Sequence, residues 1–269
     1  LFFVFLFLFL CWGLFGALLG YFLALVCCLI LFFIIWKNPV VTPDSLHQDE
    51  QKIIKKVLLF SIPITLGSLA ATSIRNINVL FVKSILENNH LAGLYTAAST
   101  ISNIPFLLFM YLPFVLMPSI SRSITQENKR LTQKYIQQSL RWLLLLILPV
   151  TALMSATSSQ LLNLLYTSEY VPASDVLSLL VLSVAFLVIF GTLGSIITGS
   201  GKPKVEMTLN ISIFLGMVIL NLYLIPKYGI IGAALSSLIS AFFGMIIGAI
   251  YIYKQFKILV NLKSTIKIM

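Results

Sequence analysis

The chain has 269 residues, of which 59% are apolar and only 10% are charged, and its formal net charge is +10. This balance excludes an ordinary soluble domain, in which about half of the residues are apolar and about a quarter are charged. The positive charge does not indicate a nucleic-acid partner, because 15 of the 18 basic residues fall in every second loop between long apolar segments. That alternation is typical of a multi-pass membrane protein whose basic loops face the cytoplasm.

The first 36 residues carry no charge. A single helix of that length would measure about 54 Å, whereas the hydrocarbon core of a bilayer is about 30 Å thick. Gly13, Gly16 and Gly20 mark a break, so residues 1–12 are expected to end one helix and residues 16–37 to form a complete one. No charged segment precedes the apolar run, which argues against a signal peptide. We therefore expect a chain that begins within a helix.

A polar linker at 38–56 follows, with Pro39, Pro43 and a mixed-charge end that is expected to lie on the membrane surface as an amphipathic helix. Six further membrane spans are predicted after this linker. They cover 57–82, 91–118, 138–158, 175–198, 205–225 and 230–253. The loop at 119–137 is expected to be partly helical. The linker, this loop, the 199–204 turn and the carboxy terminus are predicted to be cytoplasmic, and the 159–174 loop is predicted to face outward.

Two segments of the chain echo each other. GLFGALL at 13–19 and GIIGAAL at 229–235 are 216 residues apart, and each precedes an apolar helix that ends in a lysine. Duplicated halves are common in secondary transporters. The predicted fold class is therefore all-α, a polytopic membrane bundle in which 1–37 ends an amino-terminal lobe, 38–56 is an inter-lobe linker, and 57–269 is a carboxy-terminal six-helix lobe.

Arg75 is the single charge predicted to lie well inside a span, away from its ends. A buried arginine costs about 2.5–3.5 kcal/mol at the centre of a membrane helix, so polar surroundings are expected. Hydroxyl residues precede it at steps of three and four, which places them on one helix face. The next span adds a similar row. The candidate cavity-lining residues are Ser68, Thr72, Arg75, Asn76, Asn78, Tyr95, Ser99 and Ser102. In the alternative, Arg75 only anchors the helix by reaching the outer interface.

The eight acidic residues all fall in loops or at span ends. A cation exporter would be expected to use buried carboxylates, whereas an arginine fork suits phosphate oxygens. The sequence therefore favours an anionic cargo. It shows no cluster of catalytic groups and no metal-ligand spacing, so no catalytic residue, metal or cofactor is predicted.

Five short motifs occur in order along the predicted lobe. They are SIPI at 61–64, GLYTAA at 93–98, LMPSIS at 116–121, GSGKPK at 199–204 and IPKYGIIGAA at 225–234. In this order the chain resembles the Wzx-type polysaccharide flippases of the MOP superfamily over about 57–253, and 13–37 is similar to the last helix of their amino-terminal lobe. In such proteins an acid often follows the arginine of the seventh helix by about three residues. Asn78 stands at that place here, which argues against an ion-coupling role.

The resemblance implies a two-lobed transporter of the bacterial inner membrane, with a cytoplasmic carboxy terminus. Such a protein moves undecaprenyl-pyrophosphate-linked oligosaccharide to the outer leaflet by alternating access, for O-antigen, lipopolysaccharide or other surface polysaccharide. Its partners are the anionic lipid-linked cargo, the bilayer and other polysaccharide-assembly membrane proteins. Three alternatives stay open: a multidrug or cation efflux protein of the same superfamily, a membrane polysaccharide polymerase or ligase, and a structural partner of a glycan machinery. On the two-lobe reading, the lobe alone is not expected to transport.

Overall fold

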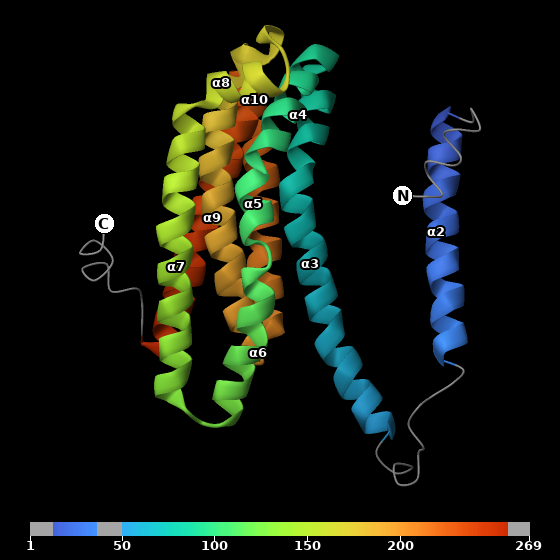
Figure 1. Ribbon diagram of the computed structural model, residues 1–269, viewed down its shortest axis with the longest axis vertical. Helices are drawn as coiled ribbons and strands as arrows, with labels where there is room; N and C mark the ends of the chain where they lie inside the picture. The colour runs from blue at the N-terminus through green and yellow to red at the C-terminus, as the bar shows by residue number, and fades with distance from the viewer. Residues whose placement is uncertain (1–12, 37–49, 258–269) are drawn as a thin grey trace. The chain divides into compact units, whose positions relative to one another are not determined.

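The computed structural model describes residues 13–36 and 50–257, and Figure 1 shows that these are helical nearly throughout. The chain divides into two compact units, Leu1–Lys55 and Lys56–Met269. The first contains α2 (Gly13–Trp36), a 24-residue helix with no charged residue in its first or last turn. Its length of about 36 Å is enough to cross the hydrocarbon core. The predicted helix end at 1–12, most of the linker and the carboxy terminus beyond 257 lie outside the described residues.

The helices from residue 50 onward form a bundle (Figure 1). They are α3 (Glu50–Leu86), α4 (Asn89–Ser102), α5 (Ile104–Phe109), α6 (Leu112–Thr125), α7 (Lys129–Ala156), α8 (Ser158–Leu165), the 3-10 helix η1 (Ser168–Ala173), α9 (Ser174–Gly199) and α10 (Pro203–Phe256). Five helical segments in the described part of the chain are long and apolar enough to cross a membrane. The predicted all-helical membrane fold is confirmed.

Helix α9 lies at the centre of the bundle, where it packs against α4, α6, α7 and α10. Most of its residues from Val176 to Gly199 are buried. A helix that is covered on all sides must be apolar all round. Towards one end Leu177 and Val181 join a core with α4 and α8, and towards the other Leu193 and Ile196 join a second core with α6 and α7.

Helix α10 consists of two helical segments joined at a kink. Gly229 has φ 58° and ψ −136°, which is not a helical conformation. Any residue with a side chain would be strained in this conformation. The hydroxyl of Ser236 donates a hydrogen bond to the side-chain oxygen of Asn221. Gly244 packs closely on Ile213, since a Cβ there would lie 2.5 Å from the Ile213 Cδ1. Both pairs lie symmetrically about residues 228–229, so the chain reverses there into an antiparallel hairpin. This hairpin matches the two predicted spans 205–225 and 230–253.

The predicted span at 91–118 is interrupted. The structure has three helices there, α4, α5 and α6, and Pro105 and Pro113 stand in the first turns of the second and third. Proline lacks an N–H and its ring clashes with the carbonyl four residues earlier, so a new helix begins at each of these prolines. The 119–137 loop is more helical than expected, because only a short turn around Glu127 separates α6 from α7.

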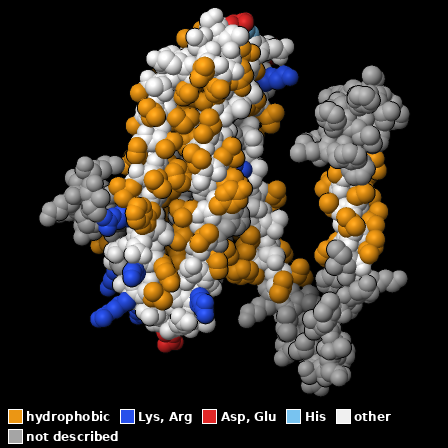
Figure 2. All heavy atoms as spheres, in the orientation of Figure 1, with side chains coloured by type: hydrophobic (Ala, Val, Ile, Leu, Met, Phe, Trp, Pro, Cys, Tyr) orange, Lys and Arg blue, Asp and Glu red, His pale blue; other side chains and the backbone are white. Residues whose placement is uncertain are grey.

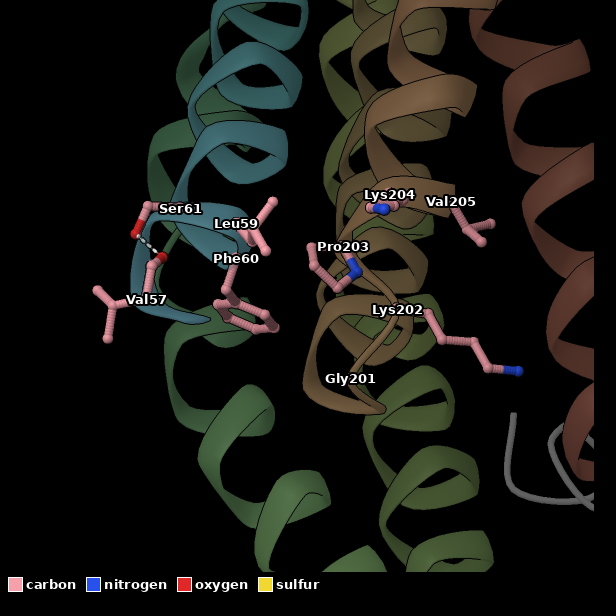
Figure 3. Close-up of a pocket in the computed structure, with 9 residues that line it drawn as sticks. All are labelled: Val57, Leu59, Phe60, Ser61, Gly201, Lys202, Pro203, Lys204 and Val205. Atoms are coloured by element: carbon pink, nitrogen blue, oxygen red, sulfur yellow. Dashed lines mark hydrogen bonds between the residues drawn. The ribbon is translucent and has the colours of Figure 1, made fainter. Parts of the chain in front are cut away.

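The charged ends of the bundle bear on its orientation in the membrane. Figure 2 shows lysine and arginine side chains gathered at the end that carries the α6–α7 turn, while apolar side chains cover the flank. The opposite end carries α8 and η1 (Figure 1). Since basic loops stay on the cytoplasmic side, we expect the α6–α7 turn to be cytoplasmic and η1 to face outward.

Cysteine labelling tests this orientation. Gln126→Cys in the α6–α7 turn and Ser168→Cys in η1 both place a thiol at an exposed position. With the native cysteines replaced, a membrane-impermeant maleimide should label only Ser168→Cys in intact cells and should label both variants after permeabilisation. Labelling of Gln126→Cys from outside intact cells would show that the topology is the opposite of the expected one.

Candidate functional site

Three hydroxyl residues on one face of α3 can lie in an apolar segment because each donates a hydrogen bond to a carbonyl oxygen of its own helix. Ser61 donates to the carbonyl oxygen of Val57 at 2.8 Å, Thr65 to that of Ser61 at 3.0 Å, and Ser68 to that of Thr65 at 2.9 Å. Each hydroxyl is thereby satisfied within an apolar segment while its oxygen can still accept a hydrogen bond. This row leads along α3 to Arg75.

Part of the predicted site lines a partly open cavity of about 340 Å³ beside α3. Ser68, Thr72 and Arg75 come from α3, and Glu206 and Asn210 come from α10. The remaining walls are largely apolar side chains and glycines: Ile64, Ala71, Ile74, Phe106, Leu187, Phe190, Gly191 and Gly194. A largely apolar cavity with a few convergent polar groups is the usual form of a ligand site.

Arg75 is partly buried at one end of this cavity. Its guanidinium carbon lies 4.3 Å from the ring centroid of Phe106, which gives a cation–π contact. In the part of the chain that the structure describes, Arg75 forms no ion pair and no hydrogen bond. Its donors are therefore free for an anionic ligand, and the ring orients the guanidinium plane.

A second, smaller cavity of about 30 Å³ adjoins the first at Arg75. Its lining includes four of the other predicted residues, Asn78, Tyr95, Ser99 and Ser102. The space suffices for one or two water molecules. The structure thus brings seven of the eight predicted residues to two adjoining cavities.

Asn76 is the exception. It is exposed, lines neither cavity, and its amide donates to the carbonyl oxygen of Thr72 at 3.0 Å. It therefore serves as a natural reference for its neighbour Asn78.

Asn78 lies in a buried network that joins three helices. Its amide donates to the hydroxyl of Tyr95 at 2.9 Å, to the carbonyl oxygen of Ala233 at 3.2 Å, and to the hydroxyl of Ser237. Its carbonyl accepts from the amide of Asn221 at 2.7 Å. Asn78 is 3% exposed and Asn221 is fully buried, so these two amides primarily hold α3 and α4 against the α10 hairpin.

The cavity also contains a group that the sequence analysis did not select. Glu206 lies in the first turn of α10 and is partly buried, and it lines the same cavity as Arg75. The available signal was its spacing from Asn210, since residues four apart share a helix face. The cavity is therefore bipolar, with a cation on α3 and a carboxylate on α10.

These features define a multi-pass α-helical membrane protein whose helical bundle carries a largely apolar cavity with a few polar groups. The MatE family model matches residues 63–224, which is more than half of the chain, so the chain belongs to the MatE family. A second family model, described as Polysaccharide biosynthesis protein, matches residues 1–124.

Two curated proteins are similar to this chain. The capsular polysaccharide biosynthesis protein CapF of Staphylococcus aureus is 24% identical over 75% of the chain and 50% of its own length. The uncharacterized membrane protein MJ1068 of Methanocaldococcus jannaschii is 22% identical over 71% of the chain and 38% of its own length. The chain thus spans half or less of these relatives.

Solved structures show the same fold. An outward-facing multidrug resistance MATE family transporter of the MOP superfamily has a TM-score of 0.66 and 17% identity, over 76% of this chain and 46% of that one. The lipid II flippase MurJ, in an inward closed conformation, has a TM-score of 0.64 and 18% identity, over 94% of this chain and 52% of that one. At these identities the likeness concerns architecture, which agrees with the predicted MOP/MATE-like lobe.

Proposed function

We propose that the full-length protein is a Wzx-type flippase that moves lipid-linked oligosaccharide across the cell membrane by alternating access. The observation that carries this proposal is Arg75, a partly buried cation in a cavity with no ion-pair partner among the described residues. A partly buried guanidinium without an ion-pair partner favours an anion, and its fork matches the oxygens of a diphosphate. The match to the polysaccharide biosynthesis model and the similarity to CapF support the same cargo class.

The domain organisation belongs to this proposal. Residues 1–37 would end an amino-terminal lobe, 38–56 would link the lobes, and 57–269 would form the carboxy-terminal lobe. Alternating access in such proteins is largely the rocking of one bundle against another around a site near the membrane midplane. The cavity with Arg75 would then supply one wall of the transport path.

The test is a transport assay on the full-length protein in proteoliposomes. The probe is a short-chain isoprenyl diphosphate that carries a fluorescent disaccharide, and dithionite quenching reports the fraction left in the outer leaflet. We expect protein-dependent translocation that vesicles with heat-inactivated protein do not show. Absence of translocation with a correctly inserted protein would refute the flippase.

Export of organic cations is the second candidate, because Glu206 also lines the cavity. A carboxylate at that position could bind a cationic drug. A fluorescent quaternary ammonium dye in the same vesicles separates the two functions. Uptake of the dye that Glu206→Gln abolishes and Arg75→Ala leaves intact would favour efflux over flipping.

A further inference from the structure

The end of the cavity opposite Arg75 is built by the first turns of α10 and the last turns of α9. Glu206 and Asn210 lie one helical turn apart on the same face of α10, and both line the cavity. The hydroxyl of Thr198 on α9 donates to the carboxylate of Glu206. Gly194 makes room for that carboxylate, since a Cβ there would lie 2.9 Å from Oε1.

These two polar groups have hydrogen-bonding capacity left over. Thr198 is the single donor that reaches the Glu206 carboxylate in the described chain, and no described basic side chain forms an ion pair with it. Asn210 is 4% exposed as a whole residue, and its side chain makes no hydrogen bond with any described residue. Both groups line the cavity and can therefore form hydrogen bonds with a ligand there.

The two ends of the cavity are separated along the helices. At Gly67, α3 approaches α10 so closely that a Cβ would lie 3.2 Å from the Cα of Met207, the neighbour of Glu206. Arg75 lies eight residues further along α3, a rise of about 12 Å. A ligand that used both ends would carry an anion near Arg75 and hydrogen-bond donors near Glu206.

A metal ion fits the Glu206 end poorly. Hard cations such as Ca²⁺ take six or more oxygen ligands, and no cluster of three or more metal-ligating side chains exists among the described residues. Sugar hydroxyls, in contrast, donate well to a carboxylate and exchange hydrogen bonds in both directions with an amide. Phe190 and Leu187 line the wall between and offer apolar contact for the C–H face of a sugar ring.

We infer that Glu206 and Asn210 form a sugar-binding subsite, which holds the first sugars of the cargo while Arg75 holds its diphosphate. This inference rests on the proposed flippase function, and it adds that the protein recognises the glycan as well as the lipid diphosphate.

Binding to the purified full-length protein in nanodiscs tests the subsite with two probes. One is a short-chain isoprenyl diphosphate, and the other is the same lipid carrying a disaccharide. The wild-type protein should bind the sugar-bearing probe more tightly. Glu206→Ala combined with Asn210→Ala should weaken binding of the sugar-bearing probe about tenfold or more, since a hydrogen bond to a charged group contributes about 1.5–3 kcal/mol. The same double variant should bind the sugar-free probe as tightly as the wild-type protein does.

Two further variants complete the design. Arg75→Ala should weaken the binding of both probes by the same factor. Glu127→Ala, at the exposed α6–α7 turn, should change the binding of neither probe. Unchanged binding of the sugar-free probe to the double variant shows that the variant is folded. Equal wild-type affinity for the two probes, or an undiminished sugar preference in the double variant, would overturn the subsite and leave the diphosphate site standing. Failure of the wild-type protein to bind either probe would overturn the subsite together with the proposed function.

Discussion

Replacement of Arg75 by alanine is expected to reduce flipping at least about a hundredfold, since a lost ion-assisted contact to a buried diphosphate costs about 3 kcal/mol or more. The variant should insert normally, because the change removes a partly buried charge that no described residue pairs. The measurement is the proteoliposome assay, together with restoration of surface glycan in a flippase-deficient strain, both normalised to the amount of protein in the membrane.

Arg75→Lys separates recognition from anchoring. Lysine keeps the charge but loses the planar fork and stacks less well on the Phe106 ring that the guanidinium covers at 4.3 Å. Partial activity is therefore expected. If Arg75 only reached the outer interface, lysine would work as well as arginine, and alanine would lower membrane abundance more than transport per molecule. Arg122→Ala, which removes an exposed arginine at the end of α6, is the control and should retain full activity.

Much of the site could be predicted because its periodicity is local. Ser68, Thr72 and Arg75 repeat at steps of four and three, and one helix geometry suffices to place them on one face. The cost of a charge in a membrane then implies that this face does not meet lipid. In the structure all three line one cavity, where Arg75 is partly buried and Ser68 and Thr72 are exposed.

Glu206 was harder to predict because its position depends on contacts far away in the sequence. Its place at the start of a span looked like an ordinary solvated helix end. Only the packing of α10 against α9 and α3, with Gly194 and Gly67 at the points of close approach, brings the carboxylate into the cavity. The pairing of Asn78 with Asn221, 143 residues apart, could not be foreseen for the same reason.

The fold shows the same division. The positions of the apolar segments followed from composition, and the hairpin at Gly229 agrees with the predicted spans 205–225 and 230–253. The breaks at Pro105 and Pro113 could not be predicted from the prolines themselves, because Pro63, Pro118 and Pro149 stand inside continuous helices. Proline signals a possible break, and the tertiary packing around it decides whether the helix ends.

Asn78 should matter most for stability. Alanine at this position would leave the Asn221 amide without an acceptor and would remove a donor from the buried hydroxyl of Tyr95, whereas the carbonyl oxygen of Ala233 would keep the hydroxyls of Ser236 and Ser237. Unpaired buried polar groups cost about 1 to 3 kcal/mol each, so we expect a loss of roughly 2 to 4 kcal/mol of unfolding free energy. The measurement is thermal or denaturant unfolding of the purified protein in detergent.

Asn78→Asp sharpens this prediction because it keeps the size of the side chain. An ionised carboxylate is an acceptor only, so it would face the carbonyl oxygen of Ala233 without the donor that the amide provides. The aspartate variant should therefore be destabilised about as much as the alanine variant. Asn76→Ala, which removes an exposed amide two residues away, should change the unfolding free energy by no more than about 0.5 kcal/mol. Equal stability of the Asn76 and Asn78 variants would mean that the buried network does not hold α3 against the α10 hairpin.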